Sequence, residues 1–286
     1  MPRIRYDTGF PSVDAQSDFN AARRARALSR IADSLRREPD DVNHILPLEE
    51  VLAALGRKGE RHEGLRTIPL SSIVGTVDRT VGFDRSFRPT SQRMRTRWER
   101  LATAMRRGEA IDPIDVFRID DMYFVKDGHH RVSVARALRH GTIDAYVTAL
   151  DTEIGGDRRL RLADLPLKGH ERLFYERVPL PDDARREIQL SDAWAYGELA
   201  EAVEAWGFRR MQAERVLMSR DAVAKAWLDD EYRPVVEMLR REEMLDGQTA
   251  AEAYMRVAGA RYRLLRTHEW SDDLVAKLKH SPDARA

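Results

Sequence analysis

The fold is decided by one stretch of sequence, residues 123–135, which reads Tyr-Phe-Val-Lys-Asp-Gly-His-His-Arg-Val-Ser-Val-Ala. Its apolar start predicts a strand, Gly128 predicts a turn, and the residues from His130 onward predict a helix. The first amides of a helix have no acceptor within the helix, and that end carries partial positive charge. Because His129, His130 and Arg131 add donors and charge there, the stretch predicts an anion site, most naturally for phosphate.

The residues of this stretch have candidate roles and competing interpretations. Gly128 would let a ligand approach the backbone closely, since it has no side chain, and Arg131 would bind the phosphate. Asp127, His129 and His130 are the catalytic candidates, and Asp127 would also orient a histidine or hold Mg²⁺ with the phosphates. Two other interpretations stay open: a structural turn in which the histidines cap neighbouring carbonyls, and a metal site formed by Asp127, His129 and His130.

The segments on either side of this stretch predict a small mixed α/β domain over residues 64–152. Strands, helices and a hairpin alternate along it, which is typical of a compact α/β unit. Asp120 and Asp121 predict the tight turn of the hairpin, and Ser91 predicts the N-cap of the first helix. The expected elements are strands at 67–70 and 73–74, a helix at 91–107, strands at 114–119 and 122–125, a helix at 130–140 and a strand at 144–148.

Residues 1–63 are expected to form a helical N-terminal arm. A helix is predicted over 14–37, and its apolar positions predict one buried face. Those positions are Phe19, Leu28, Ile31 and Leu35. The polar, charged segment Gly56–Gly64 predicts a linker between this arm and the α/β domain.

Residues 153–286 are expected to form an all-helical C-terminal domain. Helical periodicity recurs at 182–189, 192–206, 208–218, 220–245 and 249–266. Thr249 and Glu252 fit a capping box. The span 171–260 holds 19 acidic and 13 basic residues, a net charge of −6, which argues against a main nucleic-acid surface there. Residues 206–208 fit the turn of a helix-turn-helix, although acidic residues flank them, so a DNA-reading role is the weaker interpretation.

Composition narrows the classes of function. The 286-residue chain has 49 Lys+Arg and 48 Asp+Glu, a formal net charge of +1, so any basic site must be local. It has no cysteine, which excludes disulfides, thiolate catalysis and Cys-ligated zinc or iron–sulfur clusters. No apolar run approaches the roughly 18 residues of a membrane span, and no apolar secretory segment opens the chain. We therefore expect a cytoplasmic protein with no membrane partner.

The order of elements over residues 66–150, with the box at 127–131, resembles the ParB/sulfiredoxin-like superfamily. The resemblance implies an α+β fold in which a strand leads into a Gly-x-x-Arg turn and a helix. Sulfiredoxins carry Gly-Gly-Cys-His-Arg with a nucleophilic cysteine, and this chain has none, so sulfiredoxin chemistry is excluded. Partition-type ParB proteins carry Gly-Glu-Arg-Arg and bind CTP. The Asp-Gly-His-His-Arg box looks closer to the free-serine kinases of the same fold, in which the box holds nucleotide phosphates.

The resemblance also implies roles outside the box. Residues 83–90 lie where ParB-like proteins have an Arg-containing phosphate loop, so Arg85 and Arg88 are expected to contact phosphates from the side opposite the box. For the other arginines up to Arg107, a solvated helix face is the competing interpretation. Free-serine kinases use an upstream glutamate as the base. The acids in the corresponding stretch are Asp78, Asp84 and Glu99.

These observations give one leading functional expectation and two alternatives. The leading one is a ParB-like protein that binds a nucleoside di- or triphosphate (ATP, ADP or CTP) with Mg²⁺ and transfers or hydrolyses its phosphoryl group. The first alternative is a non-enzymatic, DNA-associated ParB-like partition or transcriptional regulatory protein. The second is a ParB-like nuclease. The helical C-terminal domain would serve a homodimer or a protein partner.

Overall fold

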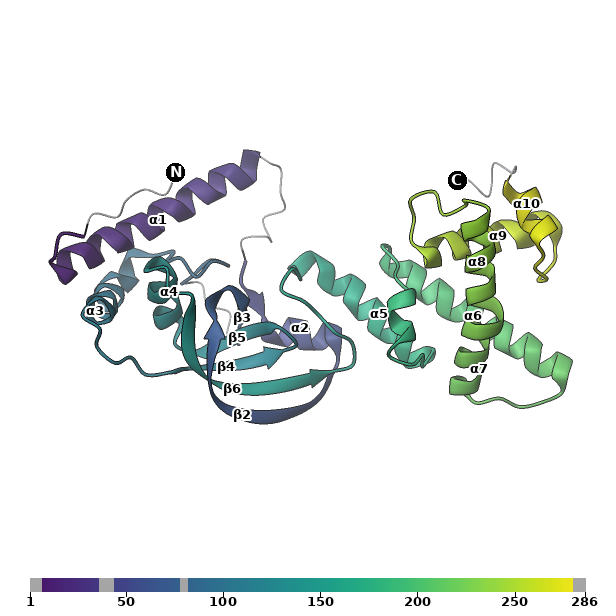
Figure 1. The fold of residues 1–286 in the computed structure, drawn as a ribbon, viewed down its shortest axis with the longest axis horizontal. Coiled ribbons are helices and arrows are strands. Elements are labelled where there is room, and N and C mark those ends of the chain that lie inside the picture. The colour runs from purple at the N-terminus through teal and green to yellow at the C-terminus, as the bar shows by residue number, and fades with distance from the viewer. Residues whose placement is uncertain (1–6, 36–43, 78–81, 280–286) are drawn as a thin grey trace. The chain divides into compact units, whose positions relative to one another are not determined.

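The computed structural model describes residues 7–35, 44–77 and 82–279. The chain divides into two compact units, Met1–Pro166 and Leu167–Ala286 (Figure 1). The finer division into segments 1–63, 64–152 and 153–286 stays a prediction from the sequence. Within the described ranges, no helix combines the length and apolar character needed to cross a lipid bilayer.

The first unit is built on a six-stranded sheet with the order β1-β3-β5-β4-β6-β2 (Figure 1). The strands are β1 Leu46–Pro47, β2 Arg57–Pro69, β3 Ile73–Thr76, β4 Ile114–Ile119, β5 Met122–Asp127 and β6 Thr142–Thr152. Strands β4 and β5 form the expected hairpin, and Asp120 takes a φ of 48° in its turn. Strand β5 lies between β3 and β4, so the box begins at the end of an interior strand.

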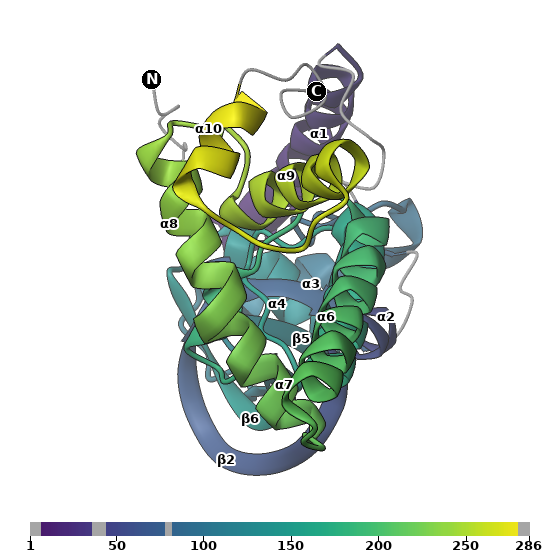
Figure 2. The same cartoon turned by 90° about the vertical axis from the view of Figure 1, so that its right-hand side faces the viewer.

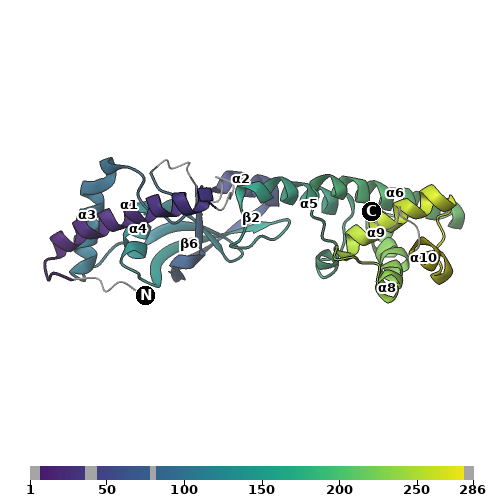
Figure 3. The ribbon, with the colours of Figure 1, turned by 90° about the horizontal axis from the view of Figure 1, so that it is seen from above.

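Three helices of this unit pack against one another: α1, α3 and α4 (Figure 3). The helices of the first unit are α1 Pro11–Leu35, α2 Leu48–Leu55, α3 Arg95–Arg106 and α4 His129–Ala137. Trp98 of α3 is fully buried and lies edge-on to Phe19 of α1, with ring centroids 5.5 Å apart. Its Nε1 donates to Ser133 Oγ of α4 at 2.8 Å. This one side chain therefore joins all three helices and fixes α4 behind the box.

Two expectations for the N-terminal region are wrong. Gly56–Gly64 is not a linker, because Gly56 is the C-cap of α2 and the residues after it belong to β2, which pairs antiparallel with β6. Strand β2 is an edge strand with mostly exposed residues, so its sequence lacks the alternation that marks a half-buried strand. On α1, Phe19 is buried but Leu28 and Ile31 are 68% and 59% exposed. An α-helix turns about 100° per residue, which places Leu28 on the face opposite Phe19.

The second unit is helical, and the expected α+β fold class is confirmed. Its helices are α5 Leu165–Arg177, α6 Ala193–Glu214, α7 Arg220–Trp227, α8 Arg233–Arg241, α9 Ala250–Leu265 and α10 Asp272–Lys279, with a π-helical turn at Leu228–Tyr232. Helix α10 contacts α8 and α9 (Figure 2). The capping box at the start of α9 is confirmed, since Thr249 and Glu252 exchange hydrogen bonds.

The expected turn at residues 206–208 is wrong, because α6 continues through it. Gly207 has a packing role instead. A Cβ at this position would lie 2.3 Å from Val223 Cγ1 of α7, so glycine allows α6 and α7 to approach closely. A helix-turn-helix at this position is therefore excluded.

Candidate functional site

The box has the predicted strand–glycine–helix geometry. Strand β5 ends at Asp127, Gly128 takes φ 102° and ψ 18°, and α4 begins at His129. This φ favours glycine, since a side chain at positive φ is strained. A Cβ at Gly128 would also lie 2.4 Å from Ile114 Cγ2. On that side Ile114 fills the space that the missing side chain leaves, so the structure itself requires this glycine.

Arg131 contacts the protein on three sides. Its Nη1 donates to the carbonyls of Asp112 at 2.9 Å and Pro113 at 2.5 Å, and its Nη2 pairs with the carboxylate of Asp127. The guanidinium therefore ties the segment before β4 to the end of β5 and the first turn of α4. Asp127 is 64% exposed and is turned towards Arg131.

The predicted arginine loop is a closed turn organised by Asp84. The buried carboxylate of Asp84 accepts from the amides of Ser86 and Arg88 and, at 2.7 Å, from Arg88 Nε. Arg88 Nη1 donates to the carbonyl of Ala25, and Arg85 Nη2 donates to that of Leu160 at 2.6 Å. Both guanidinium groups therefore hold protein atoms in this structure.

Of the three upstream acids that are candidates for the base, the structure describes Asp84 and Glu99. Asp84 is occupied by these hydrogen bonds, and Glu99 pairs with Arg95 Nε at 2.6 Å. Asp78 lies outside the described residues. Asp127, two residues before the start of α4, is the remaining carboxylate candidate.

His129 is held by the neighbouring strand. Its Nε2 lies 2.7 Å from Thr76 Oγ1, and the Thr76 hydroxyl donates to the carbonyl of Val125 at 3.1 Å. Since a hydroxyl has one proton, this arrangement places a proton on Nε2 of His129. Phe83 and Phe87 stack on its ring, with centroids 6.3 and 6.2 Å away.

His130 is the most perturbed group of the box. Its pKa is lowered to about 4, mainly by burial and to a smaller degree by electrostatic interactions with Arg97 and His129. The edge of its ring meets Phe83 at 5.3 Å. Its Nδ1 is buried and has no hydrogen-bond partner among the described residues. At neutral pH this histidine is uncharged, with one ring nitrogen unsatisfied.

The start of α4 is thus a site with positive surroundings and no local cap. Among the described residues no side chain caps the helix, so its first amides are left for another acceptor. The charge that most lowers the pKa of His130, after burial, is the guanidinium of Arg97. Within the described ranges no three His, Cys, Asp or Glu side chains gather to hold a metal ion. The arrangement therefore favours an anion over a directly bound cation.

Three residues that support the box were not predicted. Thr76 and Arg97 act on the two histidines from β3 and α3, and no local sequence signal points to them. Arg136 donates to the carbonyls of Leu70 and Ile73, each at 2.6 Å, and burial lowers its pKa to about 10. The signal that could have identified Arg136 is its place four residues after Val132, which puts both residues on one face of α4.

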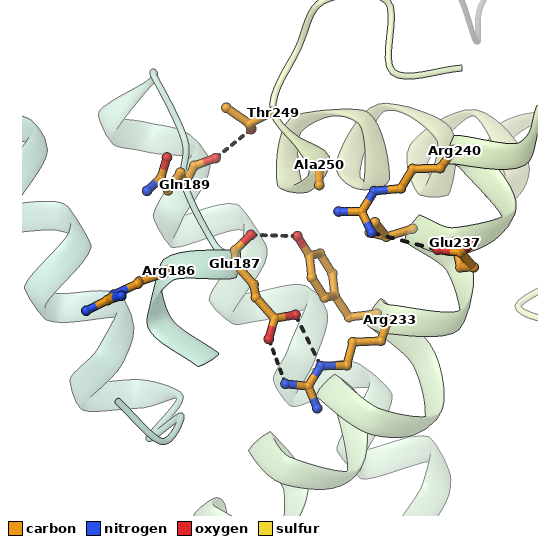
Figure 4. A pocket seen from close by; sticks show the side chains of 10 residues that line it. Arg186, Glu187, Gln189, Arg233, Glu237, Arg240, Thr249 and Ala250 are labelled. Atoms are coloured by element: carbon orange, nitrogen blue, oxygen red, sulfur yellow. Dashed lines mark hydrogen bonds and ion pairs between the residues drawn. The ribbon is translucent and has the colours of Figure 1, made fainter. Parts of the chain in front are cut away.

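A pocket of about 730 Å³ lies in the helical unit (Figure 4). Its main charges neutralise one another, since Glu187 binds Arg233 through two hydrogen bonds and Arg240 lies 3.8 Å from Glu237. Thr249 Oγ1 donates to the carbonyl of Gln189 at its edge. The charged side chains of this pocket are thus largely paired with one another, which makes it a weaker candidate for an anion site than the box.

The family described as the ParB N-terminal domain matches residues 83–155. Two solved structures, a C2221 crystal form of a Pnob8-like ParB-N domain and a pNOB8-like ParB N-domain, are 13% and 14% identical to this chain. The matches cover 80% of this chain and 93% and 87% of those chains, each with a TM-score of 0.22. No curated protein matches the chain. Residues 83–155, which include the β5–α4 junction, therefore form a ParB-like domain.

Proposed function

We propose that the ParB-like domain binds a nucleoside di- or triphosphate at the start of α4. The observation that carries this proposal is His130, whose buried Nδ1 lacks a partner at an uncapped helix N-terminus. A phosphate there would accept from the first amides of α4 and from a histidine ring nitrogen. It would also neutralise the positive charge that Arg97 places beside His130.

The proposal separates residues that bind from residues that position. His129, His130 and the first-turn amides would contact the phosphates. Arg131 would act chiefly by holding the end of β5 against the start of α4, since its guanidinium already binds two carbonyls and Asp127. Arg85 and Arg88, the other predicted phosphate ligands, would first have to leave Leu160, Asp84 and Ala25.

Mg²⁺ would arrive with the nucleotide. This ion usually keeps several waters and binds through substrate phosphates and one or two carboxylates. Asp127 fits that role, because its carboxylate is 64% exposed beside the first turn of α4. Phosphoryl transfer depends mainly on positioning and charge neutralisation. A catalytic role for Asp127, His129 and His130 in transfer or hydrolysis is the finer form of the proposal.

A panel of ATP, ADP, CTP and GTP, each with Mg²⁺ or with a chelator, tests the proposal by thermal stabilisation of the full chain. A ligand at about 100 times its Kd adds roughly 2.7 kcal/mol of stability, so the melting temperature should rise by about 5 °C or more. The matched variants are His130→Ala and His140→Ala, since His140 is an exposed histidine beyond α4. We expect His130→Ala to lose the shift and His140→Ala to keep it. If none of the nucleotides shifts the wild-type protein, the proposal is wrong.

The DNA-associated alternative rests on a different observation. Arg93, Arg97 and Arg100 are exposed on or beside α3, and no described acid pairs with them. Such a face would contact the phosphodiester backbone without reading bases. Duplex binding that ignores nucleotide and His130→Ala would favour this alternative.

A further inference from the structure

The second unit contains an apolar groove between α5 and α6. Its volume is about 440 Å³, and its walls include Leu173 and Phe174 of α5 and Trp194 and Tyr196 of α6. Phe174 and Tyr196 form a buried base, with ring centroids 5.8 Å apart. The groove has no part in the nucleotide proposal, because all its lining residues belong to Leu167–Ala286.

Two large apolar side chains of the groove face solvent. Trp194 is 74% exposed and Leu173 is 47% exposed. Trp194 has one aromatic neighbour on the other wall, since its ring meets that of His170 edge-on at 5.3 Å. In the free protein these apolar side chains remain in water, so a partner that covered them would gain hydrophobic free energy. Tryptophan is also the residue type that most often dominates a protein interface.

Gly197 is one of the residues that line the groove. It lies within α6, where glycine is less favourable than alanine because the unfolded chain gains freedom. A Cβ at Gly197 would meet no atom within 4 Å, whereas a Cβ at Gly207 of the same helix would collide with Val223. Packing therefore explains Gly207 but not Gly197. The missing side chain at Gly197 instead leaves room for a group that enters from outside.

The charges along the two helices leave an acidic surplus at the groove. Three cations of α5 already pair with acids of α5 and α6. These pairs are Lys168–Glu171, Arg172–Glu176 and Arg177–Glu204. Glu198 and Glu201 line the groove, are exposed, and make no hydrogen bond or ion pair with a described residue. Glu201 acts on Arg177 only at longer range, where it raises the pKa of that guanidinium.

We propose that this groove binds a basic amphipathic helix of a partner protein. The apolar face of that helix would cover Trp194 and Leu173, with one side chain above Gly197. Its Arg or Lys residues would face Glu198 and Glu201. Helices lie in apolar grooves through anchors at i, i+3, i+4 and i+7, and complementary charge selects the partner and its orientation.

The test uses the full chain and two labelled synthetic peptides in fluorescence anisotropy. Both peptides have leucines at i, i+3, i+4 and i+7. One has arginines on its polar face, and the other has glutamate in place of every arginine. We expect the arginine peptide to bind about tenfold more tightly or better. Trp194→Ala should weaken it by about tenfold, and Gly197→Leu should abolish binding, because its side chain fills the groove.

The role of charge is tested with a charge-reversal variant and a matched control variant. The double variant Glu198→Arg/Glu201→Arg should reverse the preference between the peptides. Glu269→Lys alters an exposed acid outside the groove and should leave the preference unchanged. Circular dichroism of each variant confirms that it is folded. Equal binding of both peptides, or unchanged binding by folded Gly197→Leu, overturns the proposal. So does self-association that Gly197→Leu abolishes, because the occupant would then be a second copy.

Discussion

The inner and outer arginines of the ParB-like domain differ in what their guanidinium groups contact. The inner group donates to main-chain carbonyls of segments distant in sequence and comprises Arg85, Arg88, Arg131 and Arg136. The outer group is exposed on or beside α3 without an ion pair to a described residue, and it comprises Arg93, Arg97 and Arg100. The inner group holds loops in place, whereas the outer group supplies surface charge.

This difference corrects a simple reading of the arginine-rich segment from Asp84 to Arg107. The segment has eight arginines and two acids, which suggests a strongly basic surface. In the structure Arg95 and Arg107 pair with nearby glutamates, and Arg106 lies 2.8 Å from Asp18 of α1. The surface charge is therefore smaller than the sequence suggests, because acids both near and distant in sequence neutralise part of it.

The largest expected effect is a loss of stability on substitution of Gly128, the glycine before the inner Arg131. Gly128→Val would place a branched side chain at φ 102° and against Ile114. Backbone strain and overpacking each cost about 1–3 kcal/mol, so we expect a loss of about 2–6 kcal/mol in the free energy of unfolding. Urea denaturation measures it. Gly108→Val is the matched control, because Gly108 also has positive φ but no atom within 4 Å of a Cβ. Equal losses of stability in the two variants would show that the contact with Ile114 does not contribute.

The next effect separates an inner arginine from an outer one. Arg131→Ala removes two hydrogen bonds to carbonyls and an ion pair with Asp127. Hydrogen bonds of charged groups contribute about 1.5–3 kcal/mol, so we expect a loss of that size in stability. Arg93→Ala should stay within about 0.5 kcal/mol, as exposed positions usually do. If the two variants unfold at the same urea concentration, the distinction between inner and outer arginines fails.

Local signals in the sequence predicted much of the fold and the position of the site. The apolar end of β5, Gly128 and the start of α4 are adjacent in the chain, so short-range chemistry fixes them. The capping box of Thr249 is local in the same way. Most of strand β2, from Arg57 to Arg66, was missed because its pairing with β6 joins segments far apart in sequence. Its edge position leaves no alternating pattern to recognise.

The partners of the site residues were less predictable than their positions. His129 and Arg131 were identified from the box, but Thr76 and Pro113, which they contact, come from other elements. Which donor is satisfied by the protein and which is left for a ligand depends on these tertiary contacts. A sequence pattern therefore names a candidate site without dividing its residues into ligands and supports.

A smaller effect is expected in the pH dependence of stability, and it comes from His130. The pKa of His130 is about 4 in the folded protein and ordinarily 6.5, so the unfolded chain binds the proton more readily. Its contribution is complete above pH 6.5 and is lost as the pH falls towards 4. Allowing for partial exposure, we expect a loss of about 1–2 kcal/mol.

The measurement is the free energy of unfolding at neutral and acidic pH, for the wild type and for His130→Gln. The wild type should lose more stability on acidification, because glutamine does not titrate. Arg97→Ala should raise the pKa of His130 in an NMR titration, whereas Arg93→Ala should leave it unchanged. A parallel decline of the wild type and His130→Gln would show that the pKa of His130 is close to its ordinary value.

The smallest effect concerns the affinity for duplex DNA, for which we expect the outer arginines to be the main ligands. Each neutralised phosphate contributes about −0.9 to the slope of log affinity against log salt. Six contacts, as the sequence cluster suggests, would give a slope near −5, whereas three outer arginines give about −3. We expect weak binding with this shallower slope and no specific duplex binding at physiological salt, since the net charge is only +1. Titration of labelled duplex at several salt concentrations measures the slope, and Arg93→Ala/Arg100→Ala should reduce it by about two units. A steep slope in the wild type that Arg85→Ala also reduces would place an inner arginine on the DNA. It would break the distinction between the two groups and favour the DNA-associated alternative over the nucleotide site.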